Sequence, residues 1–204
     1  MKPYSQSCDD NKDPILAVLR EMFAEAGVVL EIGSGTGQHA VYFAKHLPHL
    51  IWQTSDVAGN LTGIRMWLDE AALPNVLPPI LLDVSEERWP ISPVDAVFSA
   101  NTAHIMAWPR VERMFMGIGD VLRVNGVFAL YGPFNYGGDY TSESNARFDA
   151  WLKARDPLSG VRDFEALDGL AQAQGMSLLK DYAMPANNRT LVWRKLGDSK
   201  LGST

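Results

Sequence analysis

The sequence predicts an α/β fold: a seven-stranded, mostly parallel sheet with helices on both faces and an antiparallel hairpin at its C-terminal end. First, a short apolar run at 28–32 passes through a glycine-rich turn directly into the helical pattern of 38–47. Strand, glycine turn and helix are typical of the start of a nucleotide-binding domain. Second, apolar runs of strand length continue to alternate with helical patterns. Third, the final strands at 176–183 and 190–195 have a short, turn-rich link, which predicts a hairpin.

The composition is that of an ordinary globular chain and argues against several classes of function. The 204 residues are expected to form one domain, 1–204, and 47% of them are hydrophobic and 21% charged. A net charge of −6 argues against a general nucleic-acid or membrane surface, so we expect a small-molecule substrate instead. The sequence lacks the apolar run of about eighteen residues that a transmembrane helix needs, and no signal peptide is visible. The lone Cys8 fits a reducing compartment, so the expected location is cytoplasmic.

The turn after the first strand has glycines at alternate positions, which allow positive φ angles and close approach of a ligand to the backbone. The dinucleotide fingerprint G-x-G-x-x-G differs from this spacing, because its third glycine would stand at Gln38. The spacing acid-x-Gly-x-Gly-x-Gly resembles motif I of the class I S-adenosylmethionine-dependent methyltransferases. That resemblance implies that the turn passes under the methionine end of the cofactor; the alternative is a turn that binds nothing. The residues expected at the cofactor are Glu31, Gly33, Ser34, Gly35 and Gly37.

Two acids end the next two predicted strands. Asp56 follows the strand at 50–55, where a carboxylate can accept hydrogen bonds from both hydroxyls of a ribose. The alternative is that Asp56 only caps the next helix. Asp83 and Val84 follow a short strand at 80–82. The methyltransferase resemblance implies that Asp83 accepts from the adenine amino group and that the Val84 amide reaches a ring nitrogen, whereas an Asp here is also an ordinary turn residue.

The central strand predicted at 94–100 ends in polar residues. Ligands bind at the carboxyl ends of strands in open α/β sheets, so Asn101 and His104 are expected near a transferred group. His104 is either a general base, since its reference pKa is near neutrality, or a structural histidine. The loop at 132–140 carries three aromatic residues and is expected to form a substrate wall or to pack on itself. The candidate catalytic residues are Asn101, His104, Tyr131 and Asn187, and Asn101 is expected at the cofactor as well.

The two ends of the chain are expected to lie outside the sheet. Residues 1–12 are polar and predict an irregular arm. Asp13 and Pro14 predict the start of a helix, with Asp13 as its N-cap. The arm either closes over the cofactor site as a lid or remains solvated. Residues 197–204 are expected to be a solvated tail.

Seven segments carry a more specific resemblance. They are NK-x-PIL at 11–16, LEIGSGTGQHA at 30–40, SD at 55–56, YGPF at 131–134, TSESN at 141–145, FD at 148–149 and PANN at 185–188. Over nearly the whole chain they resemble a small methyltransferase-like family catalogued as domain of unknown function 938. The resemblance implies a Rossmann-like class I methyltransferase fold and binding of S-adenosylmethionine, and it adds Asn11 to the residues expected at the cofactor. It implies no particular substrate.

These features predict an S-adenosylmethionine-dependent methyltransferase that acts on a small-molecule acceptor and releases S-adenosylhomocysteine. Methyl transfer from a sulfonium mainly requires position and a dry site, so the sequence needs no nucleophile constellation. An NAD(P)-dependent oxidoreductase is one alternative, but the displaced third glycine and the terminal hairpin argue against it. A module that binds the cofactor without transferring a methyl group is the other. No metal site is predicted, because His39, His46 and His49 lie in or beside one helix without cysteines or clustered carboxylates.

Overall fold

The protein is described by a computed structural model over residues 1–197. Its seven-stranded sheet has the order β3-β2-β1-β4-β5-β9-β8. The strands are β1 (Val28–Ile32), β2 (Ile51–Asp56), β3 (Val76–Leu81), β4 (Val94–Ala100), β5 (Leu122–Gly132), β8 (Met176–Met184) and β9 (Asn188–Lys195). The first five run parallel, whereas β9 is antiparallel to both β5 and β8. The predicted sheet and its terminal hairpin are therefore confirmed, and the tail predicted at 197–204 lies, beyond residue 197, outside the described residues.

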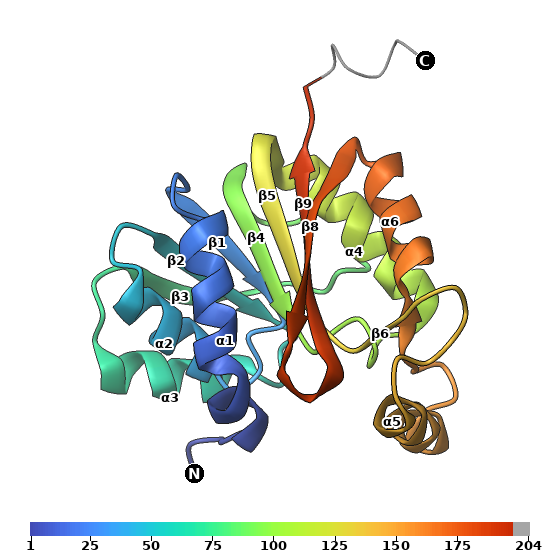
Figure 1. Cartoon of the computed structure of the whole chain (residues 1–204). Coiled ribbons are helices and arrows are strands. Elements are labelled where there is room, and N and C mark those ends of the chain that lie inside the picture. The colour runs from blue at the N-terminus through green and yellow to red at the C-terminus, as the bar shows by residue number, and fades with distance from the viewer. Residues whose placement is uncertain (198–204) are drawn as a thin grey trace.

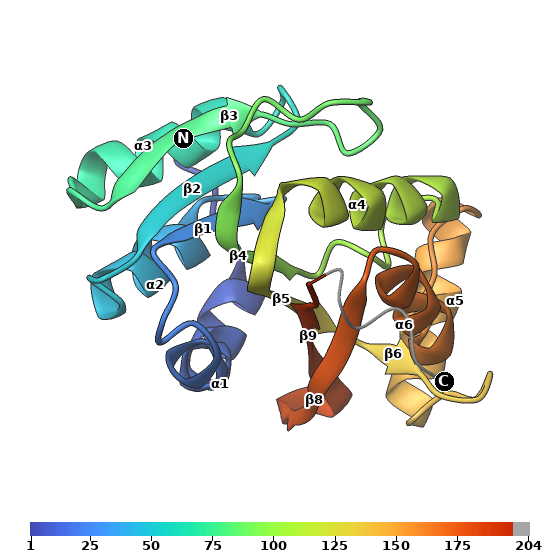
Figure 2. The same ribbon diagram turned by 90° about the horizontal axis from the view of Figure 1, so that it is seen from above.

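Helices cover both faces of this sheet. They are α1 (Gln6–Met22), α2 (Gln38–His46), α3 (Leu61–Ala71), α4 (Trp108–Val121), α5 (Glu143–Arg155) and α6 (Phe164–Ala173), with a short 3-10 turn, η1 (Pro185–Asn187), between β8 and β9. Figure 2 shows α1 and α2 on one face and α4 and α6 on the other. In Figure 1, α5 lies beyond the end of the sheet, at the same end as the N-terminus and the β8–β9 turn. No helix within residues 1–197 is long and apolar enough to cross a membrane.

Two apolar layers hold the helices to the sheet. On the α1–α2 side, the Phe43 ring meets the Phe98 ring edge to face, with centroids 5.4 Å apart, and Trp52 packs 5.6 Å from Phe43. On the other side, Phe128 of β5 stacks on Trp193 of β9, with centroids 5.4 Å apart. All five side chains are fully buried. Burial of large aromatic side chains on both faces is a main source of stability, and it explains why the central strands read as apolar runs.

The prediction of an irregular arm over residues 1–12 was wrong. Helix α1 begins at Gln6 and contains Pro14 in its interior. Tertiary contacts explain the difference. The Ser5 amide donates to the Gln38 side chain at the start of α2 (2.6 Å), and the Trp67 indole of α3 donates to the Pro3 carbonyl (2.7 Å). These contacts hold the polar segment in place, and its helical conformation is not visible in its own composition.

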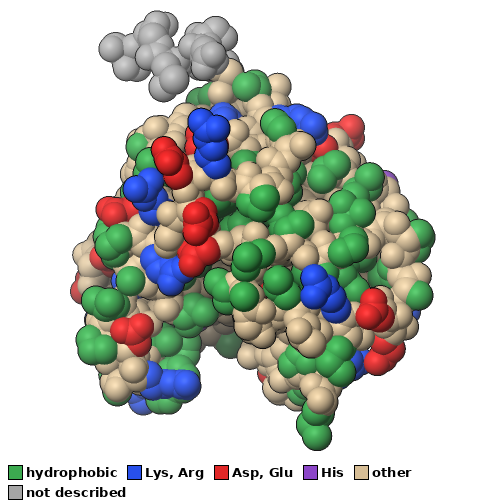
Figure 3. All heavy atoms as spheres, turned by 180° about the vertical axis from the view of Figure 1, so that it is seen from behind, with side chains coloured by type: hydrophobic (Ala, Val, Ile, Leu, Met, Phe, Trp, Pro, Cys, Tyr) green, Lys and Arg blue, Asp and Glu red, His purple; other side chains and the backbone are tan. Residues whose placement is uncertain are grey.

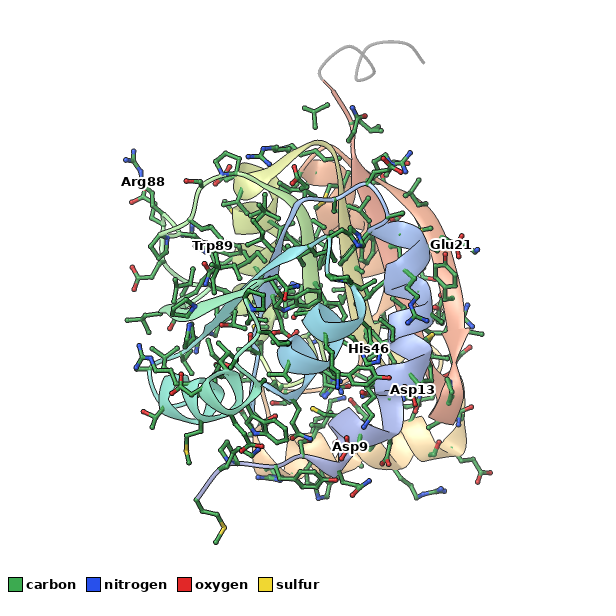
Figure 4. The ribbon with its side chains drawn as sticks, turned by 90° about the vertical axis from the view of Figure 1, so that its left-hand side faces the viewer. Asp9, Asp13, Glu21, His46, Arg88 and Trp89 are labelled. Atoms are coloured by element: carbon green, nitrogen blue, oxygen red, sulfur yellow. The ribbon has the colours of Figure 1, made fainter. Side chains whose placement is uncertain are left out.

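Asp13 is likewise not the N-cap of α1. It lies inside the helix, where its carboxylate accepts a hydrogen bond from the Tyr42 hydroxyl of α2. The Tyr42 ring in turn packs against His46, with ring centroids 4.3 Å apart. Figure 4 shows Asp13 and His46 close together where α1 crosses α2. Asp13 therefore joins two helices instead of starting one.

Smaller differences occur at the sheet edge and beyond it. The third strand begins at Val76 instead of residue 80 and includes Pro78 and Pro79. Because β3 is an edge strand, no further strand within residues 1–197 pairs with its outer side, and a proline there can lack its N–H without removing a hydrogen bond between strands. A two-stranded parallel pair, β6 (Phe134–Asn135) with β7 (Arg162–Asp163), was not predicted, because two-residue strands leave no periodic signal.

A buried carboxylate connects helix α5 to the segments on either side of it. Asp149 accepts hydrogen bonds from the Tyr140 hydroxyl (2.7 Å) and the Val161 amide (2.7 Å), and it pairs with Lys153 (2.7 Å). Burial acts to raise the pKa of Asp149, but these three partners outweigh it, and the pKa lies below its ordinary value. The carboxylate therefore stays ionised and links α5 to the segments that precede and follow it.

We expect Asp149→Ala to lower the free energy of unfolding by about 2 kcal/mol, because it leaves the buried Val161 amide without its charged acceptor and also removes the acceptor of the more exposed Tyr140 hydroxyl. Urea denaturation followed by circular dichroism measures the change. Glu143→Ala is the matched control on the same helix: Glu143 is almost fully exposed and pairs only loosely with Arg147, at 3.7 Å, so its removal should change stability much less. Equal losses in the two variants would contradict the role given to Asp149.

Candidate functional site

Two adjoining cavities open at the carboxyl ends of the parallel strands. The glycine-turn cavity has a volume of about 470 Å³ and is lined by the β1–α2 turn, by Asp56 and by the start of α1. The second, of about 590 Å³, is lined by α5, by η1 and by the ends of β4 and β5. Ser7, Asn101 and Ile105 line both cavities. The lower edge of the face in Figure 3 is hollowed in this region, between α5 and the N-terminal segment.

We call the second cavity the asparagine cavity. Five side chains of one type line it: Asn11, Asn101, Asn145, Asn187 and Asn188. They come from α1, from the β4 end, from α5 and from the β8–β9 turn, which are remote in sequence. Amide side chains offer neutral donors and acceptors, so these five residues make the cavity polar in part without adding charge.

The glycine turn has the left-handed conformation that its composition predicts. Gly33, Gly35 and Gly37 have φ angles of +71°, +59° and +92°. A Cβ atom on Gly33 would lie 2.7 Å from the Thr102 side chain, and one on Gly37 would lie 3.2 Å from the Ile64 backbone. Only glycine fits this path without strain. Gly33 and Gly35 line the glycine-turn cavity, whereas Gly37 faces α3.

Asp56 lies at the end of β2 and faces the same cavity. Its carboxylate accepts hydrogen bonds from the Gly35 amide (2.7 Å), from the Val57 amide (2.7 Å) and from the Asn60 side chain (2.9 Å). The N-cap position of α3 belongs to Asn60, so Asp56 is not simply the cap of that helix. Asp56 connects the end of β2 to the glycine turn.

Glu31 lies behind the turn. It is fully buried, and one of its oxygens accepts from the Ser34 hydroxyl (2.7 Å) and from the Trp52 indole (3.2 Å). Burial raises the pKa of Glu31 to about 7, and the nearby Asp56 charge acts in the same direction. Glu31 itself is not among the lining residues, whereas Ser34 is, so the carboxyl group acts on the cavity through Ser34.

The structure does not bring the predicted adenine residues to this cavity. Asp83 pairs with the Arg110 guanidinium, with distances of 2.5 and 2.6 Å to its two oxygens, and also accepts from the Ser85 amide. This pairing with Arg110 holds the pKa of Asp83 below its ordinary value. Val84 is buried in the apolar core on the α4 side. Neither residue lines either cavity.

The structure places His104 in the asparagine cavity, just after β4. Its ring meets the Phe148 ring of α5 edge to face, with centroids 5.2 Å apart. Burial, and secondarily the positive charge of Arg162, lower the pKa of His104 to about 4. The Arg162 guanidinium is itself committed to backbone carbonyls, including those of Ala103 (3.1 Å) and Leu158 (2.9 Å). The imidazole is therefore neutral near pH 7.

Asn11 and Tyr131 lie at the boundary between the two cavities. The Asn11 side-chain oxygen is 2.7 Å from the His39 ring, which lines the glycine-turn cavity, while Asn11 itself lines the asparagine cavity. Burial lowers the pKa of His39 to about 4. Tyr131, the last residue but one of β5, also lines the asparagine cavity, and burial raises the pKa of its hydroxyl. Asn11 therefore lies at the end of the sheet where the cofactor was expected. It lines the asparagine cavity, however, and not the cavity of the glycine turn.

Asn187 joins the β8–β9 turn to α5. Its carbonyl accepts from the Asn145 side chain (3.1 Å), and its own side chain donates to the Ser144 hydroxyl (3.1 Å). The Ser142 hydroxyl accepts a hydrogen bond from the Asn145 backbone amide (3.1 Å) and caps the start of α5. Two of the segments that carry the family resemblance, 141–145 and 185–188, thus meet at one wall of the asparagine cavity.

The aromatic wall comes from α5 and not from the loop after β5. Phe134 is buried in the core, and Tyr136 stacks on Phe164. The loop was expected to form a substrate wall or to pack on itself, but these two residues pack against the body of the protein. Phe148 and Trp151 line the cavity instead, with their rings stacked 5.8 Å apart. This pair was not predicted from the sequence, although two aromatic residues three positions apart on one helix are a signal of a shared helix face. Among residues 1–197, no three His, Cys, Asp or Glu side chains cluster as a metal site would require.

The buried Glu31 predicts an unusual dependence of stability on pH. Its pKa is raised from 4.5 to about 7 in the folded state, so the unfolded chain releases this proton first as the pH rises. Between these two values the folded state loses stability, by up to about 3 kcal/mol, and above pH 7 the loss is constant. Glu31→Gln removes this loss. We therefore expect the variant to gain stability relative to the wild type between pH 5 and pH 8, measured by urea denaturation at both values. A difference that does not change with pH would contradict the assignment.

Several solved structures with a similar fold are described as methyltransferases. An O-methyltransferase family protein from Burkholderia thailandensis has a TM-score of 0.81 at 14% identity, over 92% of this chain and 57% of that one. The S-adenosylmethionine-dependent methyltransferase SibL, in its apo form, has a TM-score of 0.79 at 19% identity, over 94% and 56%. An O-methyltransferase family 2 protein from Planctomyces limnophilus DSM 3776, in complex with apigenin, has a TM-score of 0.81 at 13% identity, over 92% and 57%. This chain thus spans little more than half the length of each.

These likenesses establish the fold: the chain has the Rossmann-like fold of the class I methyltransferases, as predicted. The family is established separately, from sequence. Residues 2–195 match the family DUF938, which is described as a protein of unknown function. Because this match covers almost the entire described chain, the protein belongs to the DUF938 family.

Proposed function

We propose that this protein is an S-adenosylmethionine-dependent methyltransferase that acts on a small-molecule acceptor. The observation that carries the proposal is the pair of adjoining cavities at the carboxyl ends of the strands, which share Asn101. The glycine-turn cavity has room for the cofactor, and the asparagine cavity has room for an acceptor. The fold shared with SibL and with O-methyltransferases supports the same activity.

The charges of the glycine-turn cavity suit S-adenosylmethionine better than a dinucleotide. Asp56 carries the only formal charge among the described residues that line it, and no lysine or arginine is among them. A pyrophosphate would bind at the helix N-terminus after the turn, but there Gln38 exchanges hydrogen bonds with the Ser5 backbone. A cofactor with a positive charge, a ribose and no phosphate matches this lining.

Two groups of this chain are proposed to hold the cofactor. Asp56 accepts hydrogen bonds from the ribose hydroxyls, because it faces the cavity at the end of β2. Glu31, through Ser34, fixes the part of the turn beside the methionine end. Asp83 pairs with Arg110, so we assign it no contact with the cofactor here. The variant described below tests whether it binds the adenine. When bound, S-adenosylmethionine supplies a methyl group already activated on a sulfonium.

On the acceptor side, the chain offers one neutral base. Burial keeps His104 unprotonated near pH 7, so its imidazole is proposed to accept a hydrogen bond from a hydroxyl or amine acceptor, although a pKa of about 4 makes it a weak base. Asn101 lines both cavities and is proposed to orient the acceptor where they meet. Tyr131 and Asn187 are proposed to contact the acceptor from β5 and from the β8–β9 turn.

Isothermal calorimetry of the full chain tests the cofactor directly. We expect micromolar binding of S-adenosylmethionine and of S-adenosylhomocysteine, and no binding of NAD. Binding of NAD alone would overturn the proposal in favour of an oxidoreductase. Cofactor binding without transfer of a labelled methyl group to any acceptor would instead favour the non-catalytic binding module.

We expect Asp56→Ala to weaken S-adenosylhomocysteine binding by more than about 1 kcal/mol, or at least fivefold in Kd, because it removes a charged hydrogen-bond acceptor. Asp83→Ala is the matched comparison, since it removes the same group from the end of the next strand. The structure predicts a much smaller effect for Asp83, whose carboxylate is paired with Arg110. Calorimetry measures both, with melting temperatures as the check on folding. A larger loss at Asp83 would favour the adenine interpretation, and unchanged binding in Asp56→Ala would remove the ribose assignment.

A further inference from the structure

The asparagine cavity contains almost no charge. Asp10, on the exposed first part of α1, is the only formally charged side chain among the described residues that line it. No lysine or arginine is among them, and the buried His104 adds no positive charge near neutral pH. An anionic ligand would therefore enter a partly enclosed space with no cation to offset its lost hydration.

Cations of the surrounding segments are engaged elsewhere, except Arg147 of α5, which pairs only loosely with Glu143 (3.7 Å) and does not line the cavity. Arg162 donates to backbone carbonyls, Arg189 pairs with Asp181 (2.7 Å), Lys153 pairs with Asp149 (2.7 Å) and Lys12 pairs with Asp9 (2.5 Å). Arg155 lies over the Trp151 ring, 4.6 Å from its centroid, and does not line the cavity. Recruiting one of these cations to a ligand would break an existing interaction.

The lining of the cavity has one apolar region on α5 and one polar region at the sheet edge. Phe148 and Trp151 present stacked rings, with an interplanar angle of 17°. The Phe148 ring also touches His104, which lines the same cavity, and Asn101 lines both this cavity and the glycine-turn cavity. A ring packed against Phe148 would therefore direct its substituent towards His104.

We propose, resting on the methyltransferase assignment, that the acceptor is an uncharged, flat aromatic compound. Its ring packs against Phe148 and Trp151, its hydroxyl or amino nucleophile points to His104 and Asn101, and the cavity rejects acceptors that carry a carboxylate or phosphate. Neutral amides such as Asn188 satisfy further polar substituents without requiring charge.

Two probes that differ in one group test the charge rule. The probes are 2-naphthol and 6-hydroxy-2-naphthoate, each titrated at pH 7 into the full chain saturated with S-adenosylhomocysteine. We expect 2-naphthol to bind at least tenfold more tightly than the naphthoate. If the naphthoate binds as tightly as 2-naphthol or more tightly, the proposal that the cavity rejects anionic acceptors is wrong. If neither probe binds, the proposal that the acceptor is aromatic is wrong. The preceding titration with S-adenosylhomocysteine tests the methyltransferase assignment separately, because that ligand enters the other cavity.

Three variants connect the result to the named side chains. Trp151→Ala should weaken 2-naphthol binding at least fivefold and leave S-adenosylhomocysteine binding unchanged. Leu158→Ala is its matched control, since Leu158 is a well-exposed apolar residue that follows α5 and does not line the cavity. Asp10→Lys supplies the missing cation on an exposed position, so it should raise the affinity for the naphthoate and not for 2-naphthol. Unchanged probe affinities in both Trp151→Ala and Asp10→Lys would show that these probes do not bind in this cavity and would overturn the proposal.

Discussion

The left-handed turn between β1 and α2 is the constraint on which the site depends. Three glycines with positive φ within five residues allow the backbone to leave the sheet and enter the helix without side chains in the way. Two carboxylates stabilise this path from different sides: Glu31 binds the Ser34 hydroxyl from the interior, and Asp56 accepts from the Gly35 amide. The turn therefore shapes one cavity and also places the end of β2 beside it.

The second cavity depends on contacts between elements that follow the parallel part of the sheet. Helix α5 lies beyond the sheet, where Asp149 attaches it to the flanking loops. The Asn145 side chain then reaches the Asn187 carbonyl in the β8–β9 turn. These hydrogen bonds fix Phe148 and Trp151 in a cavity whose described lining includes no lysine or arginine, so the chemical character of the cavity follows from how α5 is attached.

Hydrophobic periodicity predicted the sheet well, because the strands that pack between two helical layers must be apolar on both sides. The predicted bounds of β1 and β4 agree with the structure, and the antiparallel hairpin was predicted from its short link. Prediction failed at the N-terminus, where polar residues become helical through contacts of Ser5 and Pro3 with distant helices. It also failed for β3, because an edge strand tolerates prolines that would disrupt a central one.

The sequence by itself determined the fold class and the location of the glycine turn, because glycine conformation and apolar periodicity are local properties. It also placed Asp56 and His104 at the correct ends of their strands, since parallel strands end at one edge. Only the tertiary structure decided which polar groups remain available: it pairs Asp83 with Arg110, buries Phe134 and moves the aromatic wall to α5. Those outcomes depend on partners remote in sequence, and strand or helix patterns carry no information about which distant side chain a given residue will meet.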